Sequence, residues 1–442
     1  MKTALTRPSH EMNCVRSCAR RFPVGFWNYT SVARHAVNRD AKACVKDWAD
    51  VGMTLAMSPN YTSAPRDVKR VRAILDDAAE ADIRVILCHD DGYWPHLTGK
   101  GEAAYRRDFA RAVKDLGRHP AVFGFHVGDE PESIQFADAC KAQRIQKELA
   151  PHLQPFLNLL PKHPGGEARV GYESWDRYLD DYVAAARPPL LCYDCYAQMN
   201  PEADSDTAGY EGWQMYFDNL WTYWQAARRH DLDYWTTLSS VGHYRSRCPI
   251  EDDFRWQLNT ALASGARGIL WFFLYQREPH HNYRVAPIDE HWERTETYAW
   301  LSRVCRTFLK WHAPVLLESK LVQAWHVGRA WGPWPKFDGA GPVARATSSA
   351  GTPLIISQFK HASGADYLAV VNNSQTKNTQ FELVVTGKQP KLHRVGWQGM
   401  ETRLYNDSAG QGAEHGADYV KATWFIAPGQ MELMRVENVP GL

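Results

Sequence analysis

The sequence lacks an excess of charge of either sign and lacks long apolar runs. Across its 442 residues, 51 Lys and Arg face 50 Asp and Glu, so the formal net charge is +1. Because affinity for nucleic-acid phosphates comes from a basic excess, we expect no nucleic-acid partner. No run reaches the about 18 apolar residues of a transmembrane helix, so we expect no membrane partner.

A disulfide framework and an intact signal peptide are lacking as well. The nine cysteines are odd in number and are spread from Cys14 to Cys305, which is a poor pattern for disulfides. Residues 1–23 are polar and basic and contain no apolar stretch of about 7–15 residues, which a signal peptide requires. The compartment stays open: secreted or periplasmic if a signal was removed, and cytoplasmic otherwise.

Metal-binding patterns are weak. Cys192 and Cys195 have a metal-like spacing, but they lie in an apolar run that predicts a strand, where positions three apart face opposite sides. His89 with Asp90 and Asp91 has no matching His pair at another expected strand end. We therefore expect no metal and no organic cofactor.

Aromatic residues are abundant, with 18 Trp, 20 Tyr and 16 Phe. Aromatic rings stack on sugars and on nucleobases. The balanced charge of the chain disfavours nucleobase binding. The alternative is that these rings fill the core. One run with helical spacing, residues 213–224, favours helix packing over a sugar platform.

Between residues 22 and 319, eight short apolar runs alternate with longer segments of helical periodicity. Near-continuous apolar strands alternating with helices are typical of a parallel sheet that is covered on both faces. Eight such units predict an α/β fold, a (β/α)8 TIM barrel, and no nucleotide-binding glycine motif favours an open sheet. The expected strands are 22–29, 53–58, 84–89, 121–128, 154–160, 190–196, 234–240 and 268–275.

After residue 319 the helical periodicity ends. Short alternating runs separated by Gly, Asn, Ser and Asp clusters predict a C-terminal antiparallel β-sandwich. The expected strands there are 321–327, 353–359, 367–372, 379–385 and 424–427. The predicted organisation is an N-terminal tail at 1–21, a barrel at 22–319 and a β-sandwich at 320–442.

Catalytic groups of a TIM barrel lie at the C-terminal ends of its strands. Here these ends carry carboxylates, amides, hydroxyls and aromatic neighbours, a lining that suits a polyhydroxylated ligand, although polar residues there also cap helices. Arg245, Arg247 and Arg284 are compatible with an acidic sugar or a sulfate as ligand, because a guanidinium group can donate two parallel hydrogen bonds to an oxyanion. The candidate substrate-binding residues are Asn28, Tyr61, His89, Asp90, Asn158, Tyr196, His243, Tyr275 and Glu278.

The sharpest local signal is the segment Gly-Phe-His-Val-Gly-Asp-Glu-Pro at residues 124–131, where the fourth strand ends. Pro131 stops the strand and allows a helix to begin. Asp129 and Glu130 are adjacent, so we expect them to point in different directions, with one facing the barrel mouth. A carboxyl group at an apolar strand end beside another has reason for a raised pKa, which suits a general acid.

This segment resembles the fourth-strand signature of the clan A glycoside hydrolases, TIM barrels whose acid/base Glu stands at that strand end. The Asp-Glu-Pro variant is similar to a group of bacterial glycoside hydrolases that join the barrel to a C-terminal β-domain. The resemblance covers about residues 22–320 and implies a carbohydrate substrate, cleavage of O-glycosidic bonds and Glu130 as general acid. It rests on residues 124–131, 156–161, 193–196 and 265–268.

One departure from the clan leaves the mechanism open. Retaining members carry a nucleophilic Glu at the end of the seventh strand, whereas residues 235–242 contain no acid. Asp194 is our first candidate for the second carboxylate, as base or nucleophile. Further choices are Glu278, Asp289, Asp90 and Asp91.

Three alternatives remain at this point. Asp129 and Glu130 together suit substrate-assisted cleavage of a 2-acetamido sugar, as in hexosaminidases. The missing acid also fits a catalytically silent sugar-binding barrel. A metal-dependent hydrolase would use His89, Asp90 and Asp194. The sequence does not fix the oligomeric state, and a homo-oligomer is left open.

Overall fold

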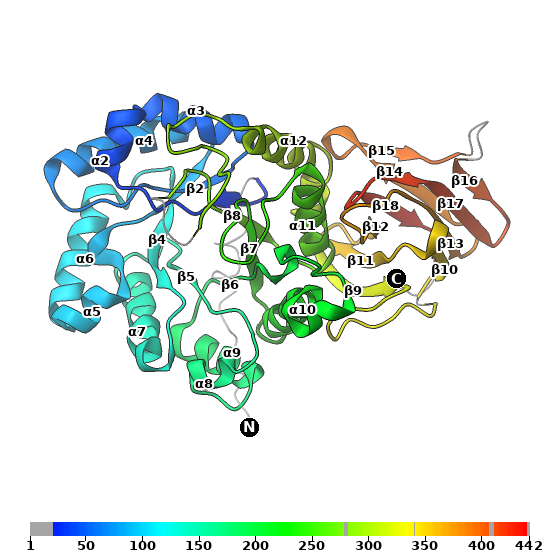
Figure 1. The fold of residues 1–442 in the computed structure, drawn as a ribbon, viewed down its shortest axis with the longest axis horizontal. Helices are drawn as coiled ribbons and strands as arrows, with labels where there is room; N and C mark the ends of the chain where they lie inside the picture. Colours follow the sequence, from blue (N-terminus) through cyan, green and yellow to red (C-terminus); the bar gives the residue numbers. More distant parts are fainter. Residues whose placement is uncertain (1–20, 278–281, 340, 406–410, 440–442) are drawn as a thin grey trace, which may run out of the picture.

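The computed structural model describes residues 21–277, 282–339, 341–405 and 411–439, which form a parallel-stranded barrel beside antiparallel sheets (Figure 1). The predicted tail lies outside the described residues except for residue 21, and so does Glu278. No helix of the described chain is long and apolar enough to cross a bilayer.

The barrel consists of two four-stranded parallel halves, in the orders β2-β3-β4-β5 and β1-β8-β7-β6. The halves meet where Thr54 N–H donates to Val24 O and Leu159 N–H donates to Cys192 O, at 2.9 and 2.8 Å. Each predicted run overlaps one strand, and the predicted fold class is confirmed. The strands are β1 (Val24–Phe26), β2 (Leu55–Met57), β3 (Arg84–Leu87), β4 (Val122–Asp129), β5 (Phe156–Asn158), β6 (Leu190–Asp194), β7 (Asp233–Ser239) and β8 (Gly268–Phe272).

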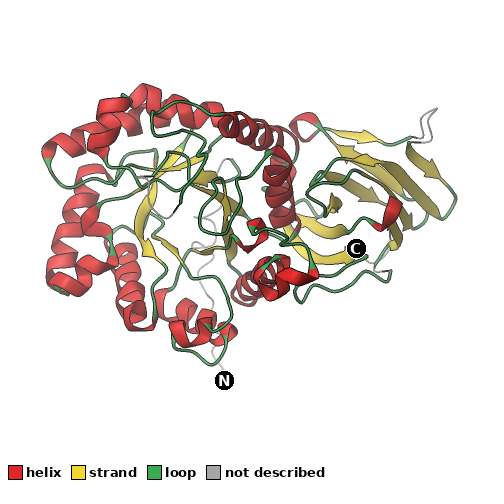
Figure 2. Ribbon diagram, in the orientation of Figure 1, coloured by secondary structure: helices red, strands yellow, loops and turns green. Residues whose placement is uncertain are grey.

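Helices surround the strands on the outside of the barrel (Figure 2). Several begin at a side-chain cap; Asp40 and Ser174, for example, accept hydrogen bonds from Ala43 N–H and Arg177 N–H. The α-helices are α2 (Val32–Asn38), α3 (Ala41–Val51), α4 (Pro65–Glu80), α5 (Trp94–Lys100), α6 (Glu102–Leu116), α7 (Ser133–Leu149), α8 (Gly166–Val170), α9 (Trp175–Ala186), α10 (Trp213–His230), α11 (Glu251–Ala263), α12 (Glu296–Trp311) and α13 (Ala313–Leu316). Short 3-10 turns are η1 (Asp90–Gly92), η2 (Ala197–Met199), η3 (Asp206–Glu211), η4 (Ser349–Gly351) and η5 (Trp397–Gly399).

The aromatic run on α10 is buried. Trp213 stacks on Trp256 with ring centroids 4.4 Å apart, and Tyr223 stacks on Tyr193 at 3.9 Å. These rings pack α10 against α11 and against β6, which confirms that the run packs the core. Cys192 and Cys195 belong to different apolar clusters, inside and outside the strand layer, as strand alternation predicts.

The C-terminal strands form two antiparallel sheets, in the orders β10-β13-β17-β16 and β15-β14-β18-β12-β11-β9. The sequence indicated only five of these ten strands. Those it missed carry many charged residues; Arg394 on β14, for example, pairs with the buried Glu432 on β18 at 2.6 Å. The strands are β9 (Ser319–Val327), β10 (Val343–Ser348), β11 (Leu354–His361), β12 (Asp366–Asn372), β13 (Thr379–Thr386), β14 (Lys391–Val395), β15 (Glu401–Arg403), β16 (Gly412–His415), β17 (Tyr419–Ile426) and β18 (Met431–Glu437).

Helix α11 lies between the barrel and the β-sandwich (Figure 1). Trp256 Nε1 donates to Asn373 Oδ1 at 2.9 Å, and Ser357 Oγ donates to Ala263 O at 2.7 Å. These buried contacts make the β-sandwich a packing partner of the barrel.

We expect Gly124→Ala to destabilise the barrel. A Cβ at Gly124 would lie 1.7 Å from the carbonyl oxygen of Gln154, so the backbone between β4 and β5 must move. Overpacking of this kind costs about 1–3 kcal/mol or more. Urea unfolding monitored by circular dichroism measures the change. The control is Gly99→Ala on α5, where a Cβ meets nothing within 4 Å; equal midpoints for the two variants would contradict the prediction.

Candidate active site

A pocket of about 350 Å³ opens where the barrel strands end. Its residues come from the ends of β1, β4, β5, β6 and β8, from the loops after β7 and β8, and from the start of α10, which is the catalytic end of a TIM barrel. The lining combines three carboxyl groups, one amide and several aromatic rings. It consists of Trp27, Tyr29, Asp129, Glu130, Asn158, Pro161, Asp194, Cys195, Tyr196, Met215, His243, Tyr244, Phe272 and Tyr283.

Asp129 and Glu130 both line this pocket, although adjacent strand residues normally point apart. The chain leaves the strand at Glu130, which has a left-handed φ of 45° and donates its N–H to Asn158 O at 2.9 Å. The pairing of β4 also shifts register against both β3 and β5, and such bulges redirect side chains beside active sites. A non-glycine residue in this conformation costs about 1–3 kcal/mol, and such strain concentrates at functional sites.

Asn158 links two of the carboxyl groups. Its Nδ2 donates to Asp129 Oδ1 at 3.0 Å and to Asp194 Oδ1 at 2.7 Å. Because one nitrogen serves both, these two oxygens are at most about 6 Å apart. The amide therefore holds both aspartates as hydrogen-bond acceptors on the floor of the pocket.

Asp194 and Glu130 influence the proton affinity of each other. Burial raises the pKa of Asp194, and its interactions with Asn158, Tyr196 and Glu130 lower it. The charge of Asp194 raises the pKa of Glu130, which favours the protonated form of Glu130.

Burial is the largest cause of a raised pKa at all three carboxyl groups. The pKa of Glu130 lies well above its usual value of 4.5, with further increases from the charges of Asp194 and Asp129 and a decrease from Arg169. The pKa of Asp129 rises to about 7, even though its side chain is open to the pocket, because protein atoms and Asp194 surround it on the other sides. Arg169 Nη2 lies 3.9 Å from Glu130 Oε2 and opposes this rise, but the net direction favours the protonated form that a general acid needs.

Aromatic rings form the walls. Tyr196 stacks on Phe272 at 4.9 Å, and Tyr283 stacks on His243 at 5.6 Å. Trp27 stacks on Tyr29 at 6.0 Å. Rings of this kind offer apolar faces for the CH-bearing faces of a sugar.

Six of the predicted site residues meet in the pocket: Asp129, Glu130, Asn158, Asp194, Tyr196 and His243. At the first strand end, Trp27 and Tyr29 line the pocket and Asn28 between them does not. The sequence pointed to this strand end but gave no signal for Trp27.

Five predicted substrate-binding residues lie outside the pocket lining. Asn28 accepts from Thr30 and donates to Met57 O, and it therefore shapes the end of β1. Tyr275 is buried and accepts a hydrogen bond from Trp48 Nε1 at 3.0 Å. Both side chains are buried in the wall of the barrel and do not face the pocket.

The other three belong to the neighbourhood of β3. Tyr61 is buried edge-on against His89, with centroids 4.7 Å apart. The ring of His89 contacts Ser63 Oγ at 3.0 Å and caps η1. Asp90 begins that turn and does not line the pocket that holds Asp194, so His89, Asp90 and Asp194 do not form a common metal site.

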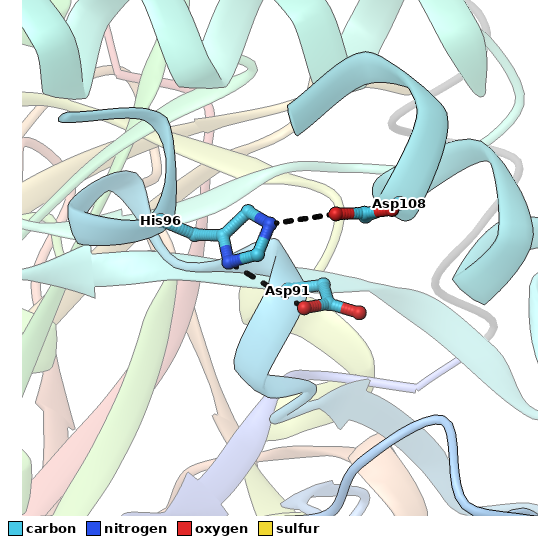
Figure 3. A group of neighbouring side chains, drawn as sticks. All are labelled: Asp91, His96 and Asp108. Carbon is cyan, nitrogen blue, oxygen red and sulfur yellow. Dashed lines mark hydrogen bonds and ion pairs between the residues drawn. The ribbon is translucent and has the colours of Figure 1, made fainter. Parts of the chain in front are cut away.

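Within the described residues, only Asp91, His96 and Asp108 approach one another closely enough to share a metal ion. His96 lies between the two carboxylates, with Nδ1 3.5 Å from Asp91 and Nε2 3.1 Å from Asp108 (Figure 3). Arg107 and Arg111 also pair with these carboxylates, at 3.0 and 3.5 Å. The cluster is therefore balanced by protein cations and is explained as an ion-pair network that fixes the loops after β3.

The end of β7 offers hydroxyl groups in place of the acid of retaining clan A enzymes. Ser239 Oγ donates to Val241 O and Ser240 Oγ donates to Phe273 O, at 2.9 and 2.7 Å. Both hydroxyl groups are buried and used by the backbone. The carboxyl groups that line the pocket are Asp129, Glu130 and Asp194.

Two solved glycoside hydrolases resemble this structure over most of their length. One, described as "Glycoside hydrolase", matches with a TM-score of 0.55 and 9% identity over 94% of this chain and 92% of that chain. A glycoside hydrolase family 5 protein from Bacteroides vulgatus ATCC 8482 matches with a TM-score of 0.55 and 10% identity over 94% and 89%. No protein-family model and no curated protein matches the sequence. At such identities the likeness shows that the chain shares the overall fold of these proteins and extends no further.

We expect Asn158→Ala to lower kcat/KM by roughly 10- to 100-fold, because a hydrogen bond to a charged group contributes about 1.5–3 kcal/mol and 1.4 kcal/mol is a factor of ten. The loss of both hydrogen bonds would also raise the pKa of Asp129 and Asp194, since each bond lowers it. Kinetics on a cleaved substrate measure the change. Asn38→Ala, at an exposed helix end, is the control; an equal effect of both would remove Asn158 from the site.

Proposed function

We propose that the protein is a glycoside hydrolase that cleaves O-glycosidic bonds with Glu130 as general acid. The observation that carries the proposal is the gathering of Glu130, Asp129 and Asp194 in one aromatic-walled pocket, where burial and the neighbouring carboxylates raise the pKa of Glu130. The pocket volume lies within the about 300–1,000 Å³ of small-molecule sites.

In the proposed reaction, Glu130 protonates the glycosidic oxygen as the bond from that oxygen to the anomeric carbon breaks. The sugar develops oxocarbenium character, and the negative charge of the aspartates stabilises it. Asp194 is the first choice for the base or nucleophile that completes hydrolysis, with water supplying the new hydroxyl group.

The separation of Glu130 and Asp194 bears on this choice. Retaining enzymes separate acid and nucleophile by about 5–5.5 Å, and inverting enzymes by about 6.5–9.5 Å. The charge of Asp194 raises the pKa of Glu130, so Asp194 favours the protonated form that a general acid needs. The distance between the two carboxyl groups in a substrate complex would distinguish retention from inversion.

A second candidate is favoured by the presence of Asp129 in the same pocket. In substrate-assisted cleavage of a 2-acetamido sugar, the acetamide attacks the anomeric carbon, an aspartate orients the acetamide and the neighbouring Glu protonates the leaving oxygen. This mechanism needs no acid at the end of β7. It predicts that the 2-acetamido substrate is cleaved while its 2-hydroxy counterpart is not.

A panel of aryl glycosides and natural glycans tests the proposal. We expect release of a reducing sugar from at least one member, and in H₂¹⁸O the new anomeric hydroxyl group carries the label. Binding of a sugar without turnover across the whole panel would contradict the proposal and favour a catalytically silent sugar-binding barrel.

A further inference from the structure

The arginines near the pocket differ in whether they form an ion pair with an acidic side chain. Arg245 pairs with Glu211, and Arg247 pairs with the buried Asp253. Arg284 donates to the carbonyl oxygens of Asn282 and Ser246. The three arginines that the sequence suggested for an acidic ligand are therefore engaged within the protein.

Arg277, in the loop after β8, has a different environment. Its guanidinium carbon lies 4.3 Å from the ring centroid of Tyr29 and 5.6 Å from that of Tyr283, and Nη1 donates to Tyr283 Oη at 3.2 Å. Both tyrosines line the pocket. Among the residues with described positions, no carboxylate lies within ion-pair distance of Arg277, so its Nε and Nη2 donors remain available.

Arg277 acts electrostatically on a carboxyl group at the floor of the pocket without forming an ion pair with it. It lowers the pKa of Asp129, but this is the smallest of the influences on that group, and the two form no ion pair. Aromatic faces hold the guanidinium in place and leave its edge free. A guanidinium group held in this way can donate parallel hydrogen bonds to the oxygens of a carboxylate or sulfate.

We propose that Arg277 binds an anionic substituent, a carboxylate or a sulfate ester, on the sugar that occupies the pocket. The inference rests on the proposed glycosidase function and assigns its substrate class as an acidic glycoside. Tyr29 and Tyr283 position the guanidinium, and Arg277 determines specificity without taking part in proton transfer.

Matched substrates test the assignment. The 4-nitrophenyl glycosides of glucose and galactose, in both anomers, are compared with their uronic acid and 6-sulfate counterparts. We expect wild type to prefer one acidic form, and Arg277→Gln to lower kcat/KM for that form by about 10- to 100-fold, the size of a charged hydrogen bond, while the neutral form changes little. The preferred acid distinguishes a uronate from a sulfate.

Arg245→Gln is the control, because Arg245 is exposed and pairs with Glu211. A preference for the neutral member of every pair, or an equal loss on both members in Arg277→Gln, would overturn the assignment. If no glycoside is cleaved, saturation-transfer NMR with glucuronate, glucose 6-sulfate and glucose decides separately. Binding of an acidic sugar that Arg277→Gln abolishes supports the inference even if the glycosidase proposal fails, and absence of such binding overturns it.

Discussion

Glu130→Gln is expected to lower kcat by on the order of 10²–10⁴ for substrates with poor leaving groups, because the amide cannot supply the proton. Substrates whose leaving group departs readily, such as 2,4-dinitrophenyl glycosides, need little protonation and should lose far less. The measurement is the rate of the variant relative to wild type along a series of leaving-group pKa values.

The control for this variant is Glu148→Gln on α7, where the exposed carboxylate pairs with Arg106 at 2.9 Å outside the pocket lining. It should retain most of the wild-type activity. A uniform loss across the leaving-group series, or equal losses in both variants, would remove Glu130 as the general acid.

Asp194→Asn has the second large expected effect. The charge of Asp194 raises the pKa of Glu130, after burial, so its removal should lower that pKa. A general acid is active while protonated, and activity falls as pH rises through its pKa. The alkaline limb of the kcat/KM profile should therefore move to lower pH, together with a loss on the order of 10²–10⁴ if Asp194 is also the base or nucleophile.

The pH dependence of kcat/KM separates a shift in the pKa of Glu130 from a loss of activity that is equal at every pH. Asp176→Asn on α9, whose carboxylate pairs with Arg229 at the surface, should leave the profile unchanged. An alkaline limb that stays in place in Asp194→Asn would show that Asp194 does not set the proton affinity of Glu130.

The barrel could be predicted because its strands are apolar on both faces. Runs such as 190–196 are buried nearly throughout, and the helices between them have clear amphipathic spacing. The β-sandwich was less accessible because β14 and β18 carry paired charges such as Arg394 and Glu432, which hide the alternation. Glu432 is buried while its partner Arg394 is partly exposed, and from the sequence alone both residues are expected on the surface.

The candidate site was predicted in part, for a similar reason. A strand end places a residue at the barrel mouth, which located Glu130, Asp194 and Asn158. Whether a residue faces the pocket depends on bulges and on single φ values, and the left-handed turn at Glu130 brings in Asp129 beside it. Periodicity does not encode such turns, and for the same reason it did not indicate that Trp27 lines the pocket while Asn28 does not.

The most direct test of the central claim is the structure of Glu130→Gln with an uncleaved substrate that wild type hydrolyses. The account predicts the glycosidic oxygen about 3 Å from the side-chain amide at position 130, within hydrogen-bonding reach, with the sugar ring over Asp129 and Asp194. A substrate whose glycosidic oxygen faces another acid, or that binds away from this pocket, would contradict it.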